Sequence, residues 1–175
     1  MKIFLFFVFF SGLFFQSCNR EKVLGFKQED FIGTVVYLNN SELYIYDRVQ
    51  DKNDILDVKE DSVKINLSQK DLRDIQKSFI ENEIGSFHDM NHDIGEVMEF
   101  FESGKTFDTY SIYTNKRKIV IKYVYTMDSS SINHQKTERF QRFYSVLDRI
   151  FTRNISQNNS FENNKKHIMK DLDIN

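Results

Sequence analysis

The stretch LSQKDLRDIQKSFIENEIG, residues 67–85, contains the start, the buried face and the end of one helix. Ser68 is a favourable N-cap, and Asp71 occupies the acidic position of a capping box three residues later. Apolar residues then follow at spacings of three and four, which places them on one helical face: Leu72, Ile75 and Phe79. Gly85 lies just beyond the expected end. The pattern therefore predicts a helix over residues 69–82.

Segments with strand character lie on both sides of this helix. The expected strands are 31–38, 42–47, 62–66, 96–101, 108–114 and 118–125. The turn sequence at 39–41 joins the first two into a β-hairpin, and a second amphipathic helix is expected within 136–152. The segments 48–61 and 85–95 predict loops. Strands joined by short turns, with two helices, predict an α+β fold: an antiparallel sheet of about five to six strands with two amphipathic helices on one face.

Composition limits the classes of function. The chain has 175 residues, which suggests one domain with additional ends. Its 24 basic and 26 acidic residues give a net charge of −2, so the charge balance does not favour nucleic acid as a partner. The single cysteine excludes an internal disulfide and a zinc site built from several cysteines. We expect no cofactor.

The N-terminal sequence MKIFLFFVFFSGLFFQSC, residues 1–18, has the pattern of a secretory signal. Lys2 provides a positive start, and an apolar run over 3–15 follows. A membrane-spanning helix needs about 20 apolar residues, so this run is too short to span. Its length matches the hydrophobic region of a signal peptide. We therefore expect residues 1–17 to be a signal peptide.

The end of this segment resembles the lipobox of bacterial lipoproteins, in which a small residue precedes a cysteine. Ser17 and Cys18 occupy those two positions. The resemblance implies that the Cys18 thiol carries lipid and becomes the mature N-terminus, and two or three acyl chains such as palmitate hold a protein stably on a bilayer. The alternative is a free thiol beside an ordinary signal-peptidase site. Asn19, by analogy with lipoprotein sorting, favours the outer membrane over the inner.

These observations give four expected segments. They are a signal peptide at 1–17, a lipidated N-terminus and tether at 18–29, an α+β globular domain at 30–153 and a polar, flexible tail at 154–175. The order of elements is similar to that of small bacterial lipoproteins of uncharacterised function, and three stretches carry the similarity: KINLSQKDLRDIQ, DTYSIYTNKRKIVIKYVY and FQRFYSVLDRIF. The resemblance implies a fold and a cell-envelope location, with the domain in the periplasm or at the cell surface. It implies no activity.

The strongest chemical motif is HDMNHD, residues 88–93. His88, Asp89 and His92 have the spacing of the zincin pattern His-Glu-x-x-His, and Asp93 and Glu96 add oxygen ligands. In a zincin the two histidines share one face of a helix, whereas this segment is rich in turn-forming residues. We therefore assign no metal site and interpret the segment as a solvated loop. Weak binding of a divalent metal is the alternative.

Other catalytic patterns are weaker. The serines at 129–131 lie near His134 without a nucleophile elbow. Lys116-Arg117-Lys118 suits either a solvated turn or contact with acidic head groups or an acidic partner. Seven tyrosines on expected strands suit a protein or glycan partner, or complete the core: Tyr37, Tyr44, Tyr46, Tyr110, Tyr113, Tyr123 and Tyr125. We expect a membrane-anchored, non-enzymatic binding domain with a protein partner. A lipid-anchored hydrolase of envelope polymers and a structural or assembly accessory are the alternatives.

Overall fold

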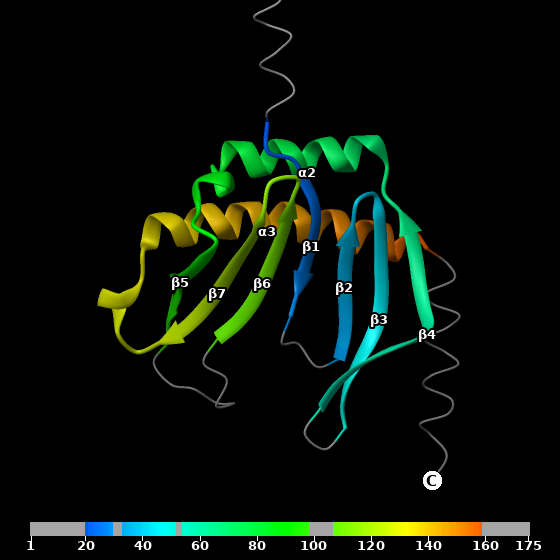
Figure 1. Cartoon of the computed structure of the whole chain (residues 1–175), viewed down its shortest axis with the longest axis horizontal. Coiled ribbons are helices and arrows are strands. Elements are labelled where there is room, and N and C mark those ends of the chain that lie inside the picture. Colours follow the sequence, from blue (N-terminus) through cyan, green and yellow to red (C-terminus); the bar gives the residue numbers. More distant parts are fainter. Residues whose placement is uncertain (1–19, 30–32, 52–53, 99–106, 159–175) are drawn as a thin grey trace, which may run out of the picture.

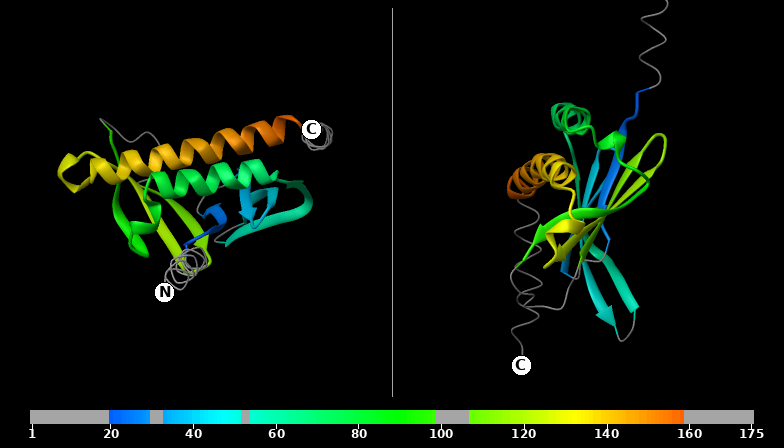
Figure 2. Two further views of the ribbon diagram at one scale, coloured as in Figure 1. Left: turned by 90° about the horizontal axis from the view of Figure 1, so that it is seen from above. Right: turned by 90° about the vertical axis from the view of Figure 1, so that its left-hand side faces the viewer.

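The computed structural model describes residues 20–29, 33–51, 54–98 and 107–158. Within these residues one seven-stranded sheet carries two helices on one face (Figures 1 and 2). The elements in chain order are β1 (Val23–Gln28), β2 (Gly33–Asn39), β3 (Glu42–Asp51), β4 (Asp54–Asn66), α2 (Gln69–Glu81), β5 (Met90–Val97), β6 (Phe107–Thr114), β7 (Lys118–Thr126) and α3 (His134–Ser156). The α+β class and the two amphipathic helices are as the sequence predicts.

The sheet differs from the prediction in its number of strands and in one pairing. The spatial order is β4-β3-β2-β1-β6-β7-β5. Neighbouring strands are antiparallel except β5 and β7, which are parallel, so the sheet is mixed. A parallel pair needs a crossover connection, and here the chain from β5 passes through β6 before β7 returns beside it. Residues 99–106 of that connection, with the end of the strand expected at 96–101, lie outside the described residues.

The helix at the centre of the sequence argument is confirmed. The Ser68 hydroxyl accepts a hydrogen bond from the Asp71 backbone N–H at 3.2 Å, and the Asp71 carboxylate accepts one from the Ser68 backbone N–H at 3.2 Å. These two bonds complete the capping box. Ile75 and Phe79 are each 2% exposed and pack in the core. The second helix begins after Asn133, whose side chain accepts from the Lys136 N–H at 3.0 Å.

The core lies between the helices and one face of the sheet. From α3 it takes Phe140, Phe143, Leu147, Ile150 and Phe151. The sheet contributes residues at every second position, as expected when one face is buried; on the central strands these include Phe26, Leu38, Tyr110, Ile112, Ile119 and Ile121. Each fully buried aliphatic or aromatic side chain contributes about 1.5–3 kcal/mol of transfer free energy. This burial holds α3 across the sheet.

The tether expected at 18–29 is wrong for residues 23–28. They form β1, which lies between β2 and β6 near the middle of the sheet, and Phe26 is only 3% exposed. Gly25 and the neighbouring charged residues suggested a flexible linker. In the structure a Cβ on Gly25 would lie 2.7 Å from the Leu38 carbonyl oxygen, so the glycine permits a close approach of two strands.

The loop expected at 48–61 is also wrong, because β3 and β4 continue through most of it as a two-stranded arm. Val49 pairs with Leu56, and both side chains are exposed, at 42% and 47%. The arm extends past the end of β2 (Figure 1). Val49, Leu56 and Val58 of this arm are exposed, and the many charged residues around them predicted a loop.

The two ends of the chain are described only in part. Helix α3 continues to Ser156, three residues into the tail expected at 154–175, and residues 159–175 lie outside the described residues. The predicted signal peptide and Cys18 lie outside them as well. Among the described residues, no helix is both long enough and apolar enough to cross a membrane.

Candidate functional site

The seven tyrosines that the sequence analysis treated as one group do not all lie on the same face of the sheet. Tyr110, Tyr123 and Tyr125 belong to the core or pack against it beneath the helices. Tyr37, Tyr44 and Tyr113 alternate with core residues and lie on the opposite, open face. Tyr46 is buried, at 6% exposure. Strand alternation therefore gives the domain two different tyrosine surfaces.

On the open face, lysines cover the tyrosine rings. Tyr37 and Tyr44 stack across β2 and β3 with their ring centroids 6.1 Å apart. The Lys27 ammonium lies 6.0 Å from the Tyr37 centroid, and that of Lys64 lies 5.7 Å from the Tyr44 centroid. Both distances are within cation–π range. The Lys64 ammonium also pairs with Glu42 at 2.5 Å.

The same arrangement continues onto β6 and β7. The Lys118 ammonium lies 5.4 Å from the Tyr113 centroid and 3.2 Å from the Glu29 carboxylate, and Lys122 lies 4.7 Å from the Phe107 centroid. Burial raises the pKa of Glu29, but its hydrogen bonds and the positive charge of Lys118 outweigh burial, so the pKa is below its usual value. Glu29 is therefore ionised near neutral pH and fixes the Lys118 side chain.

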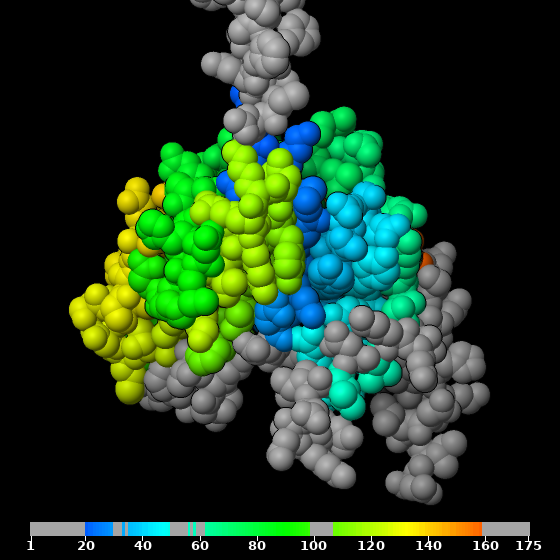
Figure 3. Space-filling view, in the orientation of Figure 1, coloured from blue at the N-terminus to red at the C-terminus, as the bar shows by residue number. Residues whose placement is uncertain are grey.

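Figure 3 looks onto this open face, where strands β5, β7, β6, β1, β2 and β3 form most of the described surface. Among the described residues, four lysines and two glutamates contact its aromatic rings, although the whole chain has a net charge of −2. Tyrosine supplies a large contact area with a polar tip, and lysine supplies charge at the rim. The described part of this surface is therefore amphipathic and locally basic.

The last four residues of the HDMNHD segment form the first half of edge strand β5, so the loop expected at 85–95 is wrong over residues 90–95. His88 and His92 are exposed. Asp89 pairs with Arg117 at 3.0 Å and Asp93 pairs with Lys136 at 2.8 Å. Within the described part of the chain, no three His, Cys, Asp or Glu side chains are placed to hold a metal ion.

Arg117, from the Lys116-Arg117-Lys118 cluster, connects parts of the fold through its hydrogen bonds. Its guanidinium donates to the carbonyl oxygens of Gly85 and Phe87, at 2.6 and 3.0 Å, and to the carboxylate of Glu21 at 3.3 Å. It thereby joins the β6–β7 turn to the segment that follows α2. Lys116 is exposed beside it. The cluster thus contributes one exposed lysine at this turn and one lysine, Lys118, on the open face.

The first described residues are bound tightly to the domain. The Lys22 N–H donates to the Asn115 side-chain oxygen at 2.7 Å, and the Asn115 N–H donates to the Lys22 carbonyl at 3.0 Å. The Val23 N–H donates to the Gln76 side-chain oxygen at 2.9 Å, and Gln76 donates to the Glu21 carbonyl at 3.0 Å. Only Asn19 and Arg20 stand between Cys18 and this hydrogen-bonded segment.

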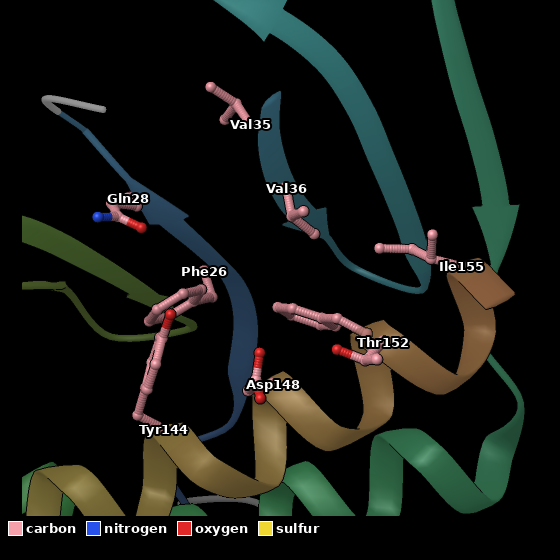
Figure 4. A pocket seen from close by; sticks show the side chains of 9 residues that line it. Phe26, Gln28, Val35, Val36, Tyr144, Asp148, Thr152 and Ile155 are labelled. Atoms are coloured by element: carbon pink, nitrogen blue, oxygen red, sulfur yellow. The ribbon is translucent and has the colours of Figure 1, made fainter. Parts of the chain in front are cut away.

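Two cavities lie between α3 and the sheet. The larger, of 300 Å³, is shown in Figure 4 between β1, β2 and the C-terminal half of α3. Its lining is Phe26, Gln28, Val35, Val36, Tyr144, Asp148, Phe151, Thr152 and Ile155. The smaller, of 210 Å³, is lined by Glu96, Tyr110, Tyr123, Tyr125, Phe140, Gln141 and Tyr144. Tyr144 lines both cavities. Neither was expected from the sequence.

Carboxylates accept from the tyrosine hydroxyls beside the smaller cavity. The Tyr123 hydroxyl donates to Glu96 at 2.6 Å, and the Tyr125 hydroxyl donates to Asp108 at 2.8 Å. The Gln141 amide donates to Glu96 at 2.8 Å. Burial, followed by these carboxylates, raises the pKa of Tyr123 and Tyr125 far above its usual value. Both phenols are therefore neutral hydrogen-bond donors at physiological pH.

Comparison with protein-family models and with curated proteins gives no match for this chain. The two tyrosine surfaces are therefore the features of the domain that bear on its function. The sequence pointed to tyrosines as a binding feature, but it missed Asp108 and Gln141 as their partners, and it considered Glu96 only as a further oxygen ligand of a metal site that was not assigned. A period-two pattern on 118–125 was the available signal, because it places Tyr123 and Tyr125 on the same face as Ile121.

Proposed function

We propose that the chain is a lipid-anchored lipoprotein of the bacterial cell envelope and that its domain is a non-enzymatic binding module. The open face of the sheet is the interaction surface. The observation that supports this proposal best is the row of tyrosine rings with lysines above them on a sheet face that the two helices leave uncovered. Interfaces favour tyrosine because it offers a large, rigid contact area with a polar tip.

The partner that suits this surface is a protein with an acidic patch. Lys64 and Lys118 have side-chain exposures of 47% and 46%, so their ammonium groups are accessible from the open face. Positive charge near the rim steers an acidic partner and sets its orientation, whereas the tyrosine area provides contact. A basic partner would be disfavoured by like charge.

The anchor in this proposal is lipid on Cys18, and the start of the domain supports a close attachment. Three residues of extended chain span at most about 11 Å, so the hydrogen-bonded segment that begins at Glu21 would lie close to the bilayer. The end of the sheet that carries the β6–β7 turn would then face the membrane. The β3–β4 arm lies at the opposite end (Figure 1) and would point away from it.

The anchor is tested by intact mass of the protein extracted from membranes, beside Cys18→Ser. We expect the wild-type chain to begin at Cys18 and to carry acyl mass, and the variant to remain unprocessed or to leave the membrane fraction. A wild-type protein that begins upstream of Cys18, or that carries a bare thiol, would overturn the anchor.

The interaction surface is tested by charge reversal in native membranes. After cross-linking, we compare wild type with Lys64→Glu and Lys118→Glu on the open face and with Lys77→Glu on α2. All three variants change the charge equally, and Lys77 is exposed away from the open face. We expect a defined cross-linked partner with wild type and Lys77→Glu, and its loss with the two open-face variants. Equal yields from all four proteins would contradict the proposal.

A further inference from the structure

The smaller cavity combines five aromatic rings with an acidic mouth. Tyr110 lies 5.2 Å from Phe140 and 5.4 Å from Tyr144, measured between ring centroids, and Tyr123 lies 5.6 Å from Tyr125. Tyr110, Tyr123 and Phe140 are at most 7% exposed and form the deeper part. Glu96 and Gln141 are exposed and lie at the rim. A ligand can therefore reach the rings from solvent.

Among the described residues that line this cavity, the one charged side chain is a carboxylate. Glu96 lines it, and Asp108 accepts from the hydroxyl of Tyr125, which also lines it. The described residues of the lining include no lysine, arginine or histidine. An anionic ligand would meet the Glu96 carboxylate, and the described lining offers no cationic side chain to attract it. A purely apolar ligand would cover the Glu96 carboxylate and remove its water without replacing it, which is unfavourable.

The tyrosine hydroxyls increase the preference for a cation. A phenol that donates to a carboxylate gains electron density on its ring, and the negative ring face is what attracts a cation. Tyr123 donates to Glu96 at 2.6 Å and Tyr125 donates to Asp108 at 2.8 Å. The same carboxylates, after burial, raise the pKa of both phenols.

We propose that this cavity binds the head group of an organic ammonium cation. Its volume of 210 Å³ is below the range of about 300–1,000 Å³ typical of sites for whole drug-sized ligands, so a head group is what fits. A hard metal ion would need several converging oxygen ligands, and the described residues provide no such group. Aromatic rings with a nearby carboxylate instead suit a methylated ammonium group. This site is separate from the open face and does not depend on the lipid anchor.

The test uses choline chloride and its neutral carbon isostere, dimethylbutanol, titrated by calorimetry into the full chain in a detergent without choline. The two probes have the same shape and differ in charge. We expect choline to bind about tenfold or more tightly than the isostere, as expected for a desolvated cation–π site. Equal affinities, or no binding of choline at millimolar concentration, would overturn the proposal.

Variants then assign the binding to this cavity. We expect Glu96→Gln to weaken choline binding about three- to tenfold and to reduce its dependence on ionic strength. Asp74→Asn on α2 removes the same charge outside the cavity, and we expect it to leave the affinity unchanged. Tyr125→Phe keeps the ring but loses the hydroxyl, so it provides a second cavity variant, checked by circular dichroism for correct folding. Equal effects of the Glu96 and Asp74 variants, or an unchanged affinity in both cavity variants, would contradict the assignment.

Discussion

The two faces of the sheet differ in the charged neighbours of their tyrosines, although tyrosine hydroxyls donate to carboxylates on both. Beneath the helices, Tyr123 and Tyr125 donate their hydroxyls to carboxylates. On the open face, Lys27 and Lys118 place ammonium groups over the rings of Tyr37 and Tyr113. One face thus uses the polar tip of the phenol and the other also uses its negative ring surface. The difference arises from neighbours rather than from the tyrosines, and it gives one face a negative cavity and the other a basic surface.

The largest loss of stability is expected from a substitution on the buried face of β6. Two neighbouring residues of this strand, whose side chains point to opposite faces of the sheet, allow the comparison. Ile112 is fully buried, whereas Tyr113 lies on the open face. We expect Ile112→Ala to reduce the free energy of unfolding by about 2–5 kcal/mol, because it removes core contacts and leaves a cavity. Tyr113→Ala should cost about 1 kcal/mol. Urea denaturation measures both. Similar losses would mean that the open face is as closely packed as the core.

A smaller loss of stability is expected at the contact between helices α2 and α3. Asp71 completes the cap of α2 and also accepts from Arg153 of α3. Burial raises its pKa, but the hydrogen bonds from Ser68 and the charge of Arg153 outweigh burial, so its pKa is below 3.8. We expect Asp71→Ala to cost about 2 kcal/mol at neutral pH, because it removes the cap and leaves Arg153 without this carboxylate.

The pH dependence of this effect has a definite sign. A carboxylate whose pKa is lower in the folded state stabilises the fold above the unfolded value, and the contribution disappears as the pH falls through the folded value. Wild type and Asp71→Ala should therefore converge in stability below about pH 4. A difference that stays constant down to pH 2 would show that the carboxylate charge is not responsible.

Tyr123→Phe tests the hydroxyl contacts of the covered face. The ring stays, and the bonds to Glu96 and Gln141 are lost, so we expect a loss of about 1 kcal/mol at neutral pH. In the folded state the pKa of Tyr123 is raised, so its contribution is full below pH 10, the unfolded value, and is lost at higher pH. Wild type should lose stability above about pH 10 more steeply than the variant, as measured by thermal unfolding. Parallel pH profiles would contradict the assigned burial.

Some elements of the fold could be predicted from the sequence and others could not. Helix α2 was predictable because its cap and its apolar face are local, and the β2–β3 hairpin was predictable from alternation and a turn. Strand β1 was not, because Gly25 and its charged neighbours resemble a linker and its role depends on two distant strands. The β3–β4 arm was missed because its charged residues, around a short apolar patch, resemble a loop.

The candidate sites were harder to predict than the helices and hairpin, because they are formed by residues far apart in the sequence. That tyrosines alternate on strands could be read from the sequence, but their partners could not. Glu96 reaches Tyr123 only because β5 pairs in parallel beside β7. Asp108 reaches Tyr125 through the antiparallel pairing of β6 with β7. Because these contacts come from strand register, the local sequence pattern could not pair Glu96 with Tyr123.

The smallest expected effect concerns Lys118, and it separates stability from binding on the open face. The Lys118 ammonium pairs with Glu29 and lies over Tyr113, but nearly half of its side chain is exposed. Water and salt screen such a pair, so Lys118→Ala should change the free energy of unfolding by less than about 0.5 kcal/mol. Urea denaturation at low and high salt measures this, and the small loss should decrease further as salt increases. A loss above about 2 kcal/mol would mean that Lys118 holds the sheet together and that its exposure serves no partner.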